Sequence, residues 1–272
     1  MYLPILCIIS VLLSALTCWA LPVRNAWLIP ISIGFFLAYL IGLVILTFVY
    51  LFISSLLLPK ESPPPKKSRF AYANVKSFCK ATIQVSRMRL NVSGLEKIPD
   101  EPFLYIANHR SNLDPFLTIA LLAPRDISFA TKEGNMKRPI VGPYIRRAGF
   151  LVIDRENPRN ALKTIRTAAD LINRDHIAFG IYPEGTRNTT DEPLLPFHEG
   201  VFMTAQKANV PVVVAATKNT EQVAKRFPFR STKVSFSVLH VYSAEEVKSR
   251  RQADLSNEAY SIILKHLTEG DA

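Results

Sequence analysis

Residues 103–115 read FLYIANHRSNLDP and join two elements of different kinds. The first five residues form a short, continuous apolar run, which is typical of a strand buried on both faces of a sheet. Pro115 opens a second apolar run, which we expect to be a helix ending near residue 122, because proline is favoured in the first turn of a helix. The stretch therefore predicts a buried strand that leads through a polar loop into a helix, as in an α/β fold.

The same alternation continues towards the C-terminus. We expect further strands near residues 127–130, 150–153, 177–182, 210–215 and 233–239, and helices near residues 138–148, 158–173 and 201–208. Asn157 and Pro158 are typical of a helix start, and residues 243–246 (SAEE) form a capping box that opens a last helix. Apolar strands that alternate with helices predict a largely parallel central sheet covered by helices.

The N-terminal part has a different composition. Between Met1 and Pro59 the only charged side chain is Arg24. Residues 2–21 and 27–58 are uncharged runs, each long enough as a helix to cross the hydrocarbon core of a membrane. Because the basic start of a secretory signal is missing, we expect a retained, membrane-embedded hairpin of two helices, which crosses the bilayer twice or dips into one leaflet.

The expected domain organisation has three parts. Residues 1–59 are the anchor, residues 60–69 (KESPPPKKSR) are a basic, proline-rich linker, and residues 70–272 are the α/β domain. The loop of the hairpin offers only Arg24, so the positive-inside rule places the domain on the cytoplasmic side of the membrane. Residues 70–89 have apolar side chains at helical spacing, which predicts a helix packed on the domain or one lying on the membrane surface.

Composition excludes several classes of function. The net charge of +11 suits anionic lipids or an acidic partner. The basic residues are dispersed and lack an aromatic platform, so we expect no nucleic-acid partner. The three cysteines, Cys7, Cys18 and Cys79, give neither a disulfide framework nor a metal-site spacing, so a reducing compartment fits and no metal is expected. The motifs G-x-S-x-G, G-x-G-x-x-G, H-E-x-x-H and the P-loop are absent from the sequence.

His109 and Asp114 are the candidate catalytic pair. On one continuous helix these side chains would point about 140° apart, so we expect His109 at the strand end and Asp114 as the N-cap of the next helix. The loop between them would then fold the imidazole onto the carboxylate. Such a pair suits a general base, because the carboxylate keeps one ring nitrogen protonated while the other accepts a proton from a hydroxyl. The alternative is a helix cap beside a loop histidine.

Charged side chains also follow three other expected strands. Residues 182–187 (YPEGTR) place Glu184 and Arg187 after one strand, and Lys132 and Arg155 follow two others. Carboxyl ends of parallel strands meet at one sheet edge, where open α/β sheets bind ligands. An arginine there can grip a phosphate with two hydrogen bonds. Each charge alone is equally a solvated surface group, but together they predict a base beside a cationic pocket for an anionic substrate.

These blocks resemble those of the PlsC-type 1-acylglycerol-3-phosphate O-acyltransferases. Residues 108–114 resemble the H-x4-D block, residues 149–155 (GFLVIDR) the second block, residues 182–187 the P-E-G-T-R block and residues 210–213 (VPVV) the apolar fourth block. All four occur in the family's order. An H-x4-D block alone is a weak signal, whereas its combination with P-E-G-T-R at this distance is specific.

The resemblance implies transfer of a fatty acyl group from acyl-CoA or acyl carrier protein to the sn-2 hydroxyl of lysophosphatidic acid, which gives phosphatidic acid. It implies no resident cofactor and no acyl-enzyme. His109 would be the general base and Asp114 would orient it. The residues that would bind or shape the acceptor's phosphate site are Lys132, Arg155, Glu184, Gly185, Thr186 and Arg187. Membrane lipids, the lysophospholipid acceptor and the acyl donor are the implied partners.

Two positions depart from the family's pattern. Asn188 stands where the family often has serine, and His198 replaces lysine in the block LPFHEG at residues 195–200. Loss of a permanent positive charge leaves other acceptors open, either another lysophospholipid or glycerol-3-phosphate. A non-catalytic protein that binds anionic lipid is the alternative of another class, and the presence of both His109 and Asp114 argues against it.

Overall fold

The computed structural model describes residues 2–21, 27–59, 67–122, 125–154 and 158–269. In this part of the chain, seven strands form one sheet in the order β1-β7-β6-β2-β5-β3-β4. The strands are β1 (Met88–Ser93), β2 (Leu104–Ala107), β3 (Ile127–Thr131), β4 (Leu151–Val152), β5 (Ala178–Ile181), β6 (Val212–Lys218) and β7 (Thr232–Tyr242).

Strand direction decides which chain ends meet at each edge of the sheet. The five neighbouring strands β6, β2, β5, β3 and β4 run parallel to one another. Strand β7 is antiparallel to β6, and β1 is parallel to β7. The carboxyl ends of five strands therefore share one edge with the amino ends of β7 and β1. The predicted α/β fold with a largely parallel sheet is confirmed.

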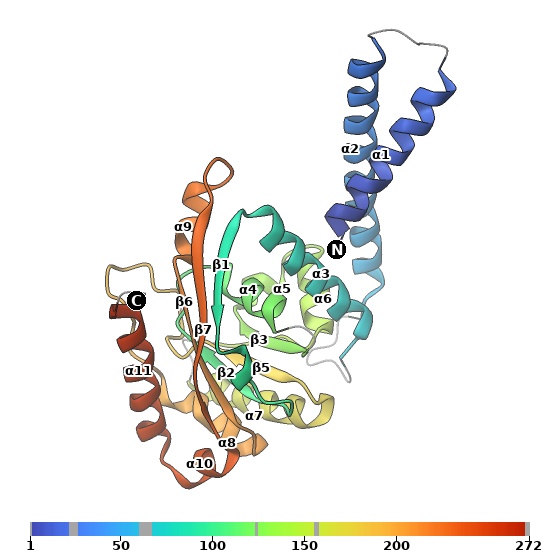
Figure 1. Cartoon of the computed structure of the whole chain (residues 1–272). Coiled ribbons are helices and arrows are strands. Elements are labelled where there is room, and N and C mark those ends of the chain that lie inside the picture. The colour runs from blue at the N-terminus through green and yellow to red at the C-terminus, as the bar shows by residue number, and fades with distance from the viewer. Residues whose placement is uncertain (1, 22–26, 60–66, 123–124, 155–157, 270–272) are drawn as a thin grey trace.

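Helices cover both faces of the sheet (Figure 1). One face packs against α3 (Arg69–Val85), α4 (Asp114–Leu121) and α6 (Val141–Arg147), and the other packs against α7 (Pro158–Asp175), α8 (Phe202–Ala208) and α11 (Gln252–Thr268). Side chains of β2 alternate between the two cores, with Tyr105 and Ala107 in the first and Leu104 and Ile106 in the second. The strand is thus buried on both faces, as its continuous apolar sequence predicts.

Helix α3 packs on the domain, which is the first of the two alternatives for residues 70–89. Its buried face includes Tyr72, Val75 and Cys79. The Tyr72 hydroxyl donates to the carbonyl of Ile127 at 3.2 Å and accepts from the same residue's N–H at 2.6 Å. Helix α3 is therefore fixed at the first residue of β3.

Three local predictions differ from the structure. The helix expected at residues 138–148 is α6, which begins three residues later because Ile140 has a positive φ of 65°, and the short α5 (Glu133–Met136) before it was not expected. Strand β1 and helix α9 (Thr220–Arg226) were not expected. The capping box of Ser243 and Glu246 is present, but it opens the short α10 (Ala244–Ser249), and α11 begins separately. The predicted N-cap Asn157 lies outside the described residues.

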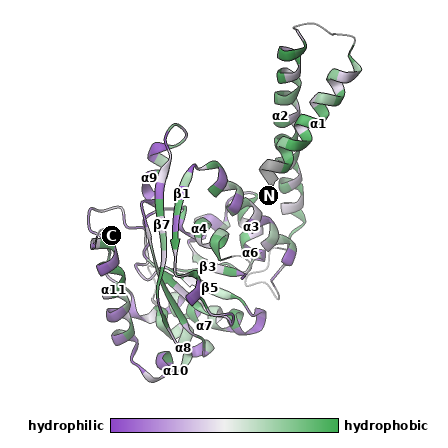
Figure 2. Ribbon diagram, viewed as in Figure 1, coloured by the Kyte–Doolittle hydropathy of each residue, from purple (hydrophilic) through white to green (hydrophobic). Residues whose placement is uncertain are grey.

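Two apolar helices, α1 (Tyr2–Ala20) and α2 (Leu28–Leu57), form a hairpin that projects from the domain (Figure 1). Apolar residues cover both helices, whereas the domain's outer helices carry many polar ones (Figure 2). Among the described residues, only α2 is long and apolar enough to cross a membrane by length and composition, and the apolar helix Ile5–Ala20 is shorter than that.

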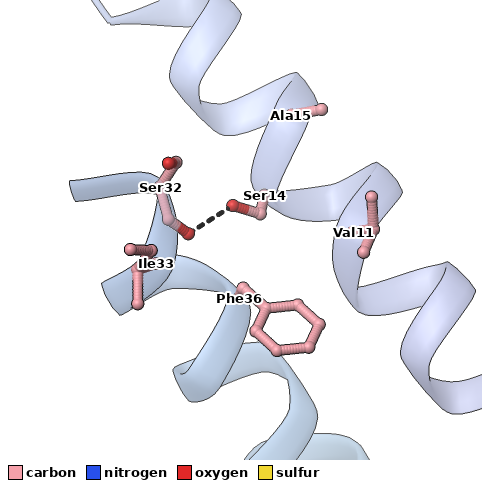
Figure 3. A pocket seen from close by; sticks show the side chains of 6 residues that line it. All are labelled: Val11, Ser14, Ala15, Ser32, Ile33 and Phe36. Carbon is pink, nitrogen blue, oxygen red and sulfur yellow. Dashed lines mark hydrogen bonds between the residues drawn. The ribbon is translucent and has the colours of Figure 1, made fainter. Parts of the chain in front are cut away.

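Small polar side chains join the two hairpin helices. The Ser14 hydroxyl donates to the Ser32 carbonyl at 2.7 Å, and the Thr17 and Tyr39 hydroxyls lie 2.8 Å apart. A shallow hollow of about 280 Å³ opens beside the first contact (Figure 3), lined by Val11, Ser14, Ala15, Ser32, Ile33 and Phe36. Small side chains allow close approach of helices in an apolar environment, and hydrogen bonds between them replace the absent water.

The end of α2 contacts the domain. The Ser54 hydroxyl lies 2.6 Å from the Tyr144 hydroxyl of α6, and Ser55 is buried. Leu51 and Leu58 pack against the core beneath α3 and α6. Side-chain contacts therefore join the hairpin to the domain.

Candidate active site

His109 and Asp114 meet at the carboxyl end of β2. The imidazole Nδ1 lies 2.8 Å from the Asp114 carboxylate oxygen Oδ2. His109 is 9% exposed and Asp114 is fully buried. The loop between them folds back, as the expected pairing requires. A carboxylate accepts a hydrogen bond from Nδ1–H, so this contact favours the tautomer whose Nε2 carries a lone pair.

The Asp114 carboxylate accepts hydrogen bonds from other groups besides His109. Its Oδ2 also accepts the backbone N–H groups of Arg110 at 2.8 Å and Ser111 at 2.7 Å, and its Oδ1 accepts the hydroxyl of Thr220. The expectation that Asp114 caps α4 is wrong. Its carboxylate accepts from the loop that precedes the helix, because the loop's amides point back at it. Four donors therefore hold the carboxylate, which fixes the orientation of the histidine ring.

The ring of His109 is also held by aromatic stacking. It stacks on Tyr182, with ring centres 4.1 Å apart and planes at 12°. Tyr182 in turn stacks on Phe129 at 5.7 Å and 13°. No described residue hydrogen-bonds to Nε2 of His109. The stack and Asp114 fix the ring, and Nε2 is left for a ligand.

Glu184 joins two loops at the site. One carboxylate oxygen accepts the N–H of His109 at 2.5 Å and the other accepts the N–H of Leu195 at 3.0 Å. Burial raises the pKa of the Glu184 carboxyl to about 7, although the two N–H donors and nearby Arg110 act in the opposite direction. Because both carboxylate oxygens accept backbone N–H groups, Glu184 positions His109 against the loop that contains Leu195.

The turn after β5 depends on a glycine. Gly185 has a positive φ of 69°, and a Cβ added there would lie 2.9 Å from the His198 ring. Glycine is the residue that adopts this conformation without strain. Thr186 and Arg187 follow it and are exposed. The block LPFHEG therefore lies against the turn that carries Arg187.

The expected cationic residues follow strands next to β2. Lys132 follows β3 and Arg187 follows β5, and β5 lies between β2 and β3. Both side chains are exposed, and neither makes a hydrogen bond or ion pair with another described residue. Arg155, expected to complete this group, lies outside the described residues. The structure thus places Lys132 and Arg187 at the same sheet edge as His109.

Sequence reasoning missed three residues that support the site. Thr220 lies 106 positions after Asp114 and holds its Oδ1. The Asn108 amide bridges β2 to β6, donating to the Thr217 carbonyl at 2.9 Å and accepting its N–H at 2.8 Å. The N–H of Asn188 donates to the His109 carbonyl at 2.7 Å. Asn108 and Asn188 lie in or beside the sequence blocks quoted above, but all three contacts join distant segments, which the spacing of residues does not reveal.

The chemistry available at this edge is proton transfer. Nε2 of His109 can take a proton from a bound hydroxyl, and the carboxylate of Asp114 stabilises the resulting imidazolium. Lys132 and Arg187 supply positive charge on the side of β5 and β3. Among the described residues, no group of three His, Cys, Asp or Glu side chains could hold a metal ion.

Comparison with known proteins gives a consistent family match. Residues 89–218 match the family model described as Acyltransferase. The 1-acyl-sn-glycerol-3-phosphate acyltransferase of Saccharomyces cerevisiae is 30% identical over 132 residues, which cover 48% of this chain and 43% of that protein. The enzyme of the same name from Haemophilus influenzae is 28% identical over 168 residues, which cover 62% of this chain and 69% of that protein. The chain thus spans less than half the length of the yeast relative.

A solved structure has the same fold. The crystal structure of the 1-acyl-sn-glycerophosphate (LPA) acyltransferase PlsC from Thermotoga maritima aligns with a TM-score of 0.63 and 21% identity. The alignment covers 84% of this chain and 91% of that one. Because it extends over 84% of the chain, the likeness in fold reaches beyond residues 89–218.

Proposed function

We propose, from the membership of residues 89–218 in the acyltransferase family, that this chain transfers a fatty acyl group to the sn-2 hydroxyl of lysophosphatidic acid and forms phosphatidic acid. The relatives named 1-acyl-sn-glycerol-3-phosphate acyltransferase support the acceptor. The observation that carries the proposal is the buried His109–Asp114 pair, in which Nε2 has no hydrogen-bond partner among the described residues. A pair of this kind is suited to activating a hydroxyl.

In the proposed reaction, Nε2 of His109 takes the proton of the acceptor hydroxyl as its oxygen attacks the thioester carbonyl. The carbonyl carbon gains the new C–O bond and loses its C–S bond, and the imidazolium returns the proton to the leaving thiolate. Asp114 keeps Nδ1–H in place throughout and offsets the positive charge of the imidazolium. The acyl group passes directly between the two substrates, without an acyl-enzyme.

The acceptor's phosphate would bind beyond β5. Lys132, Arg155 and Arg187 are the proposed cations, and Gly185 and Thr186 shape the turn that presents Arg187. Two exposed cations at neighbouring strand ends, without acidic partners among the described residues, support this placement. Acyl-CoA or acyl carrier protein is the proposed donor, used as a co-substrate, and no resident cofactor takes part.

The substrates explain the proposed membrane attachment. A lysophospholipid and a long acyl chain both partition into a bilayer, so an anchored site meets them there. The apolar hairpin of α1 and α2 is the proposed anchor, and the charge distribution around it favours a domain on the cytoplasmic side. The contact between Ser54 and Tyr144 ties the anchor to the helix that covers the site's face of the sheet.

A different acceptor head group is the second candidate. His198 lies against the Gly185 turn, where the family's pattern has a lysine. One permanent positive charge fewer near Arg187 favours an acceptor whose phosphate carries a single negative charge, such as a lysophosphodiester.

Mass spectrometry of the lipid products tests the proposal. Purified full-length protein would receive oleoyl-CoA or oleoyl carrier protein with lysophosphatidic acid, lysophosphatidylglycerol, lysophosphatidylcholine or glycerol-3-phosphate. Phosphatidic acid from the first acceptor is the expected product. Product from another acceptor alone would assign a different acceptor and leave the proposed mechanism unchanged. Absence of product from every pair of donor and acceptor would contradict the assignment as an acyltransferase.

A further inference from the structure

A hollow lined by polar side chains opens at the sheet edge that carries His109. It lies beyond β6, on the side away from β2. It has a volume of about 380 Å³, which lies within the range of roughly 300–1,000 Å³ typical of small-molecule sites. Strands β1 and β7 and helix α9 provide its lining, which consists of Arg89, Asn219, Gln222, Arg226, Ser231, Thr232 and Lys233.

The lining of this hollow is cationic. Arg89, Arg226 and Lys233 supply three positive charges, and no acidic residue lines it. Their side chains are exposed and make no ion pair with a described residue. The nearest acid in the sequence, Glu221, has one carboxylate oxygen 3.3 Å from the Gln222 side-chain amide. None of the three cations therefore has an acid as an ion-pair partner within the described part of the chain, although the other Glu221 carboxylate oxygen is buried without a hydrogen-bond partner there.

Two of these cations face each other across neighbouring strands. Arg89 of β1 and Lys233 of β7 are register partners in the parallel pair. Like charges on directly paired positions destabilise a sheet unless a counter-charge is present. Their pairing at the mouth of a hollow therefore points to an anionic ligand that lies between them.

Two consecutive residues link the hollow to the His109–Asp114 pair. Asn219 lines the hollow, and the next residue, Thr220, donates to the Asp114 carboxylate. The proposed acceptor cations Lys132 and Arg187 lie on the opposite side of β2, beyond β5. The two cationic groups thus lie on either side of His109. This arrangement suits two anionic substrates whose reacting groups must meet at Nε2.

We propose that this hollow binds the phosphate groups of the acyl donor, in the form of a coenzyme A thioester. The inference rests on the proposed acyl transfer and adds the place of its donor. Coenzyme A carries a diphosphate and a ribose phosphate at the end of a long flexible arm, so its anionic part sits away from the thioester. Arg89, Arg226 and Lys233 bind these phosphates.

Binding of free coenzyme A to the full-length protein in neutral detergent tests the site, because this probe has no acyl group to transfer. The Arg89→Gln/Lys233→Gln variant is expected to bind it about tenfold or more weakly, the usual effect of losing charged hydrogen bonds. The control, Arg166→Gln/Lys207→Gln, removes the same charge from exposed positions of α7 and α8 and should bind like the wild type. Pantetheine, which lacks phosphates, should bind both double variants and the wild type equally weakly.

Kinetics then separate this inference from the proposed function. The hollow variant is expected to raise KM for oleoyl-CoA with little change in KM for the lysolipid. Unchanged coenzyme A binding would overturn the site, and equal losses in both double variants would show unspecific charge attraction. A raised KM for oleoyl carrier protein alone would assign the hollow to that protein, and would overturn the nucleotide assignment.

A lipid surface is the competing ligand, because exposed Phe227 and Phe229 follow Arg226 directly. Weaker flotation of the hollow variant on phosphatidylglycerol vesicles, with unchanged coenzyme A binding, would assign the cations to lipid and overturn the inference. Lost coenzyme A binding in a protein that forms no lipid product would keep the site and contradict the proposed function instead.

Discussion

His109 is fixed by three contacts that come from different segments of the chain. Asp114 holds Nδ1, the Tyr182 ring stacks on the imidazole, and Glu184 accepts the backbone N–H. Only the first of these could be predicted from sequence, because it joins residues of one loop. The stack and the carboxylate bridge join strands β2 and β5, so they depend on strand order, which the spacing of residues does not reveal.

Glu184 gives a prediction about pH and stability. Its carboxyl has a pKa of about 7 in the folded protein against the ordinary value of 4.5, and burial is the main cause. Between these pH values the folded protein holds a proton that the unfolded chain releases. The free energy of unfolding therefore loses a contribution as pH rises from about 4.5 to 7. Glu184→Gln removes this titration, so the wild type should lose stability relative to the variant over that interval.

Thermal unfolding midpoints of both proteins at several pH values would measure the difference. Glu96→Gln is the matched control, because Glu96 is an exposed carboxylate in the short helix after β1. The control should follow the pH profile of the wild type. A constant difference between wild type and Glu184→Gln from about pH 5 to pH 8 would show that Glu184 titrates alike in folded and unfolded chains.

At the scale of elements, an aromatic stack connects the core to the site. Phe129 of β3 and Gly180 of β5 are register partners, and a Cβ added to Gly180 would lie 2.1 Å from the Phe129 ring. Phe129 supports Tyr182, and Tyr182 supports the ring of His109. The absence of a side chain at position 180 therefore leaves the space in which the stack forms.

Gly180→Ala is expected to displace the Phe129 ring and to disturb both stability and catalysis. Overpacking of a buried site costs about 1–3 kcal/mol in the free energy of unfolding. The unfolding midpoint and kcat should both fall, and Gly180→Ala/Phe129→Leu should recover part of the stability by making room. A Gly180→Ala variant with unchanged midpoint and unchanged kcat would contradict this role of the stack.

Burial determined which strands could be predicted from the amino-acid sequence. The strands β2, β3 and β5 are buried and continuously apolar, so their sequences and the charged residues after them identified the sheet edge. Strand β1 is largely exposed and reads MRLNVS, so it lacks that signal. The antiparallel pairing of β6 with β7 was not apparent, because it depends on the path of α9 and the loop after it.

At the scale of the whole molecule, the anchor and the domain share packed side chains. Leu51 of α2 and Leu58, the residue after this helix, pack against the core, and Ser54 contacts Tyr144 of α6. The uncharged runs predicted the hairpin. They could not predict its contact with the domain, because the length of the linker does not determine how close the two parts lie. These contacts therefore hold the end of the hairpin against one face of the domain.

Deletion of residues 1–59 is expected to release the protein from membranes. In the proposed attachment the apolar hairpin provides the main membrane affinity, so the full chain should float with neutral lipid vesicles and the truncated chain should not. Deletion of residues 1–48 is the control for folding, since it keeps the contacts of Leu51, Ser54 and Leu58. Complete flotation of both truncated chains at high salt would show that another surface anchors the protein.

In the proposed reaction, His109 removes the proton from the acceptor hydroxyl. The most direct measurement is the rate of phosphatidic acid formation by His109→Ala relative to the wild type, with folding checked by the thermal unfolding midpoint. Loss of a general base predicts a fall of about 10²–10⁴-fold in kcat in a variant that stays folded at the assay temperature. A folded His109→Ala protein that forms the product at the wild-type rate would contradict the account.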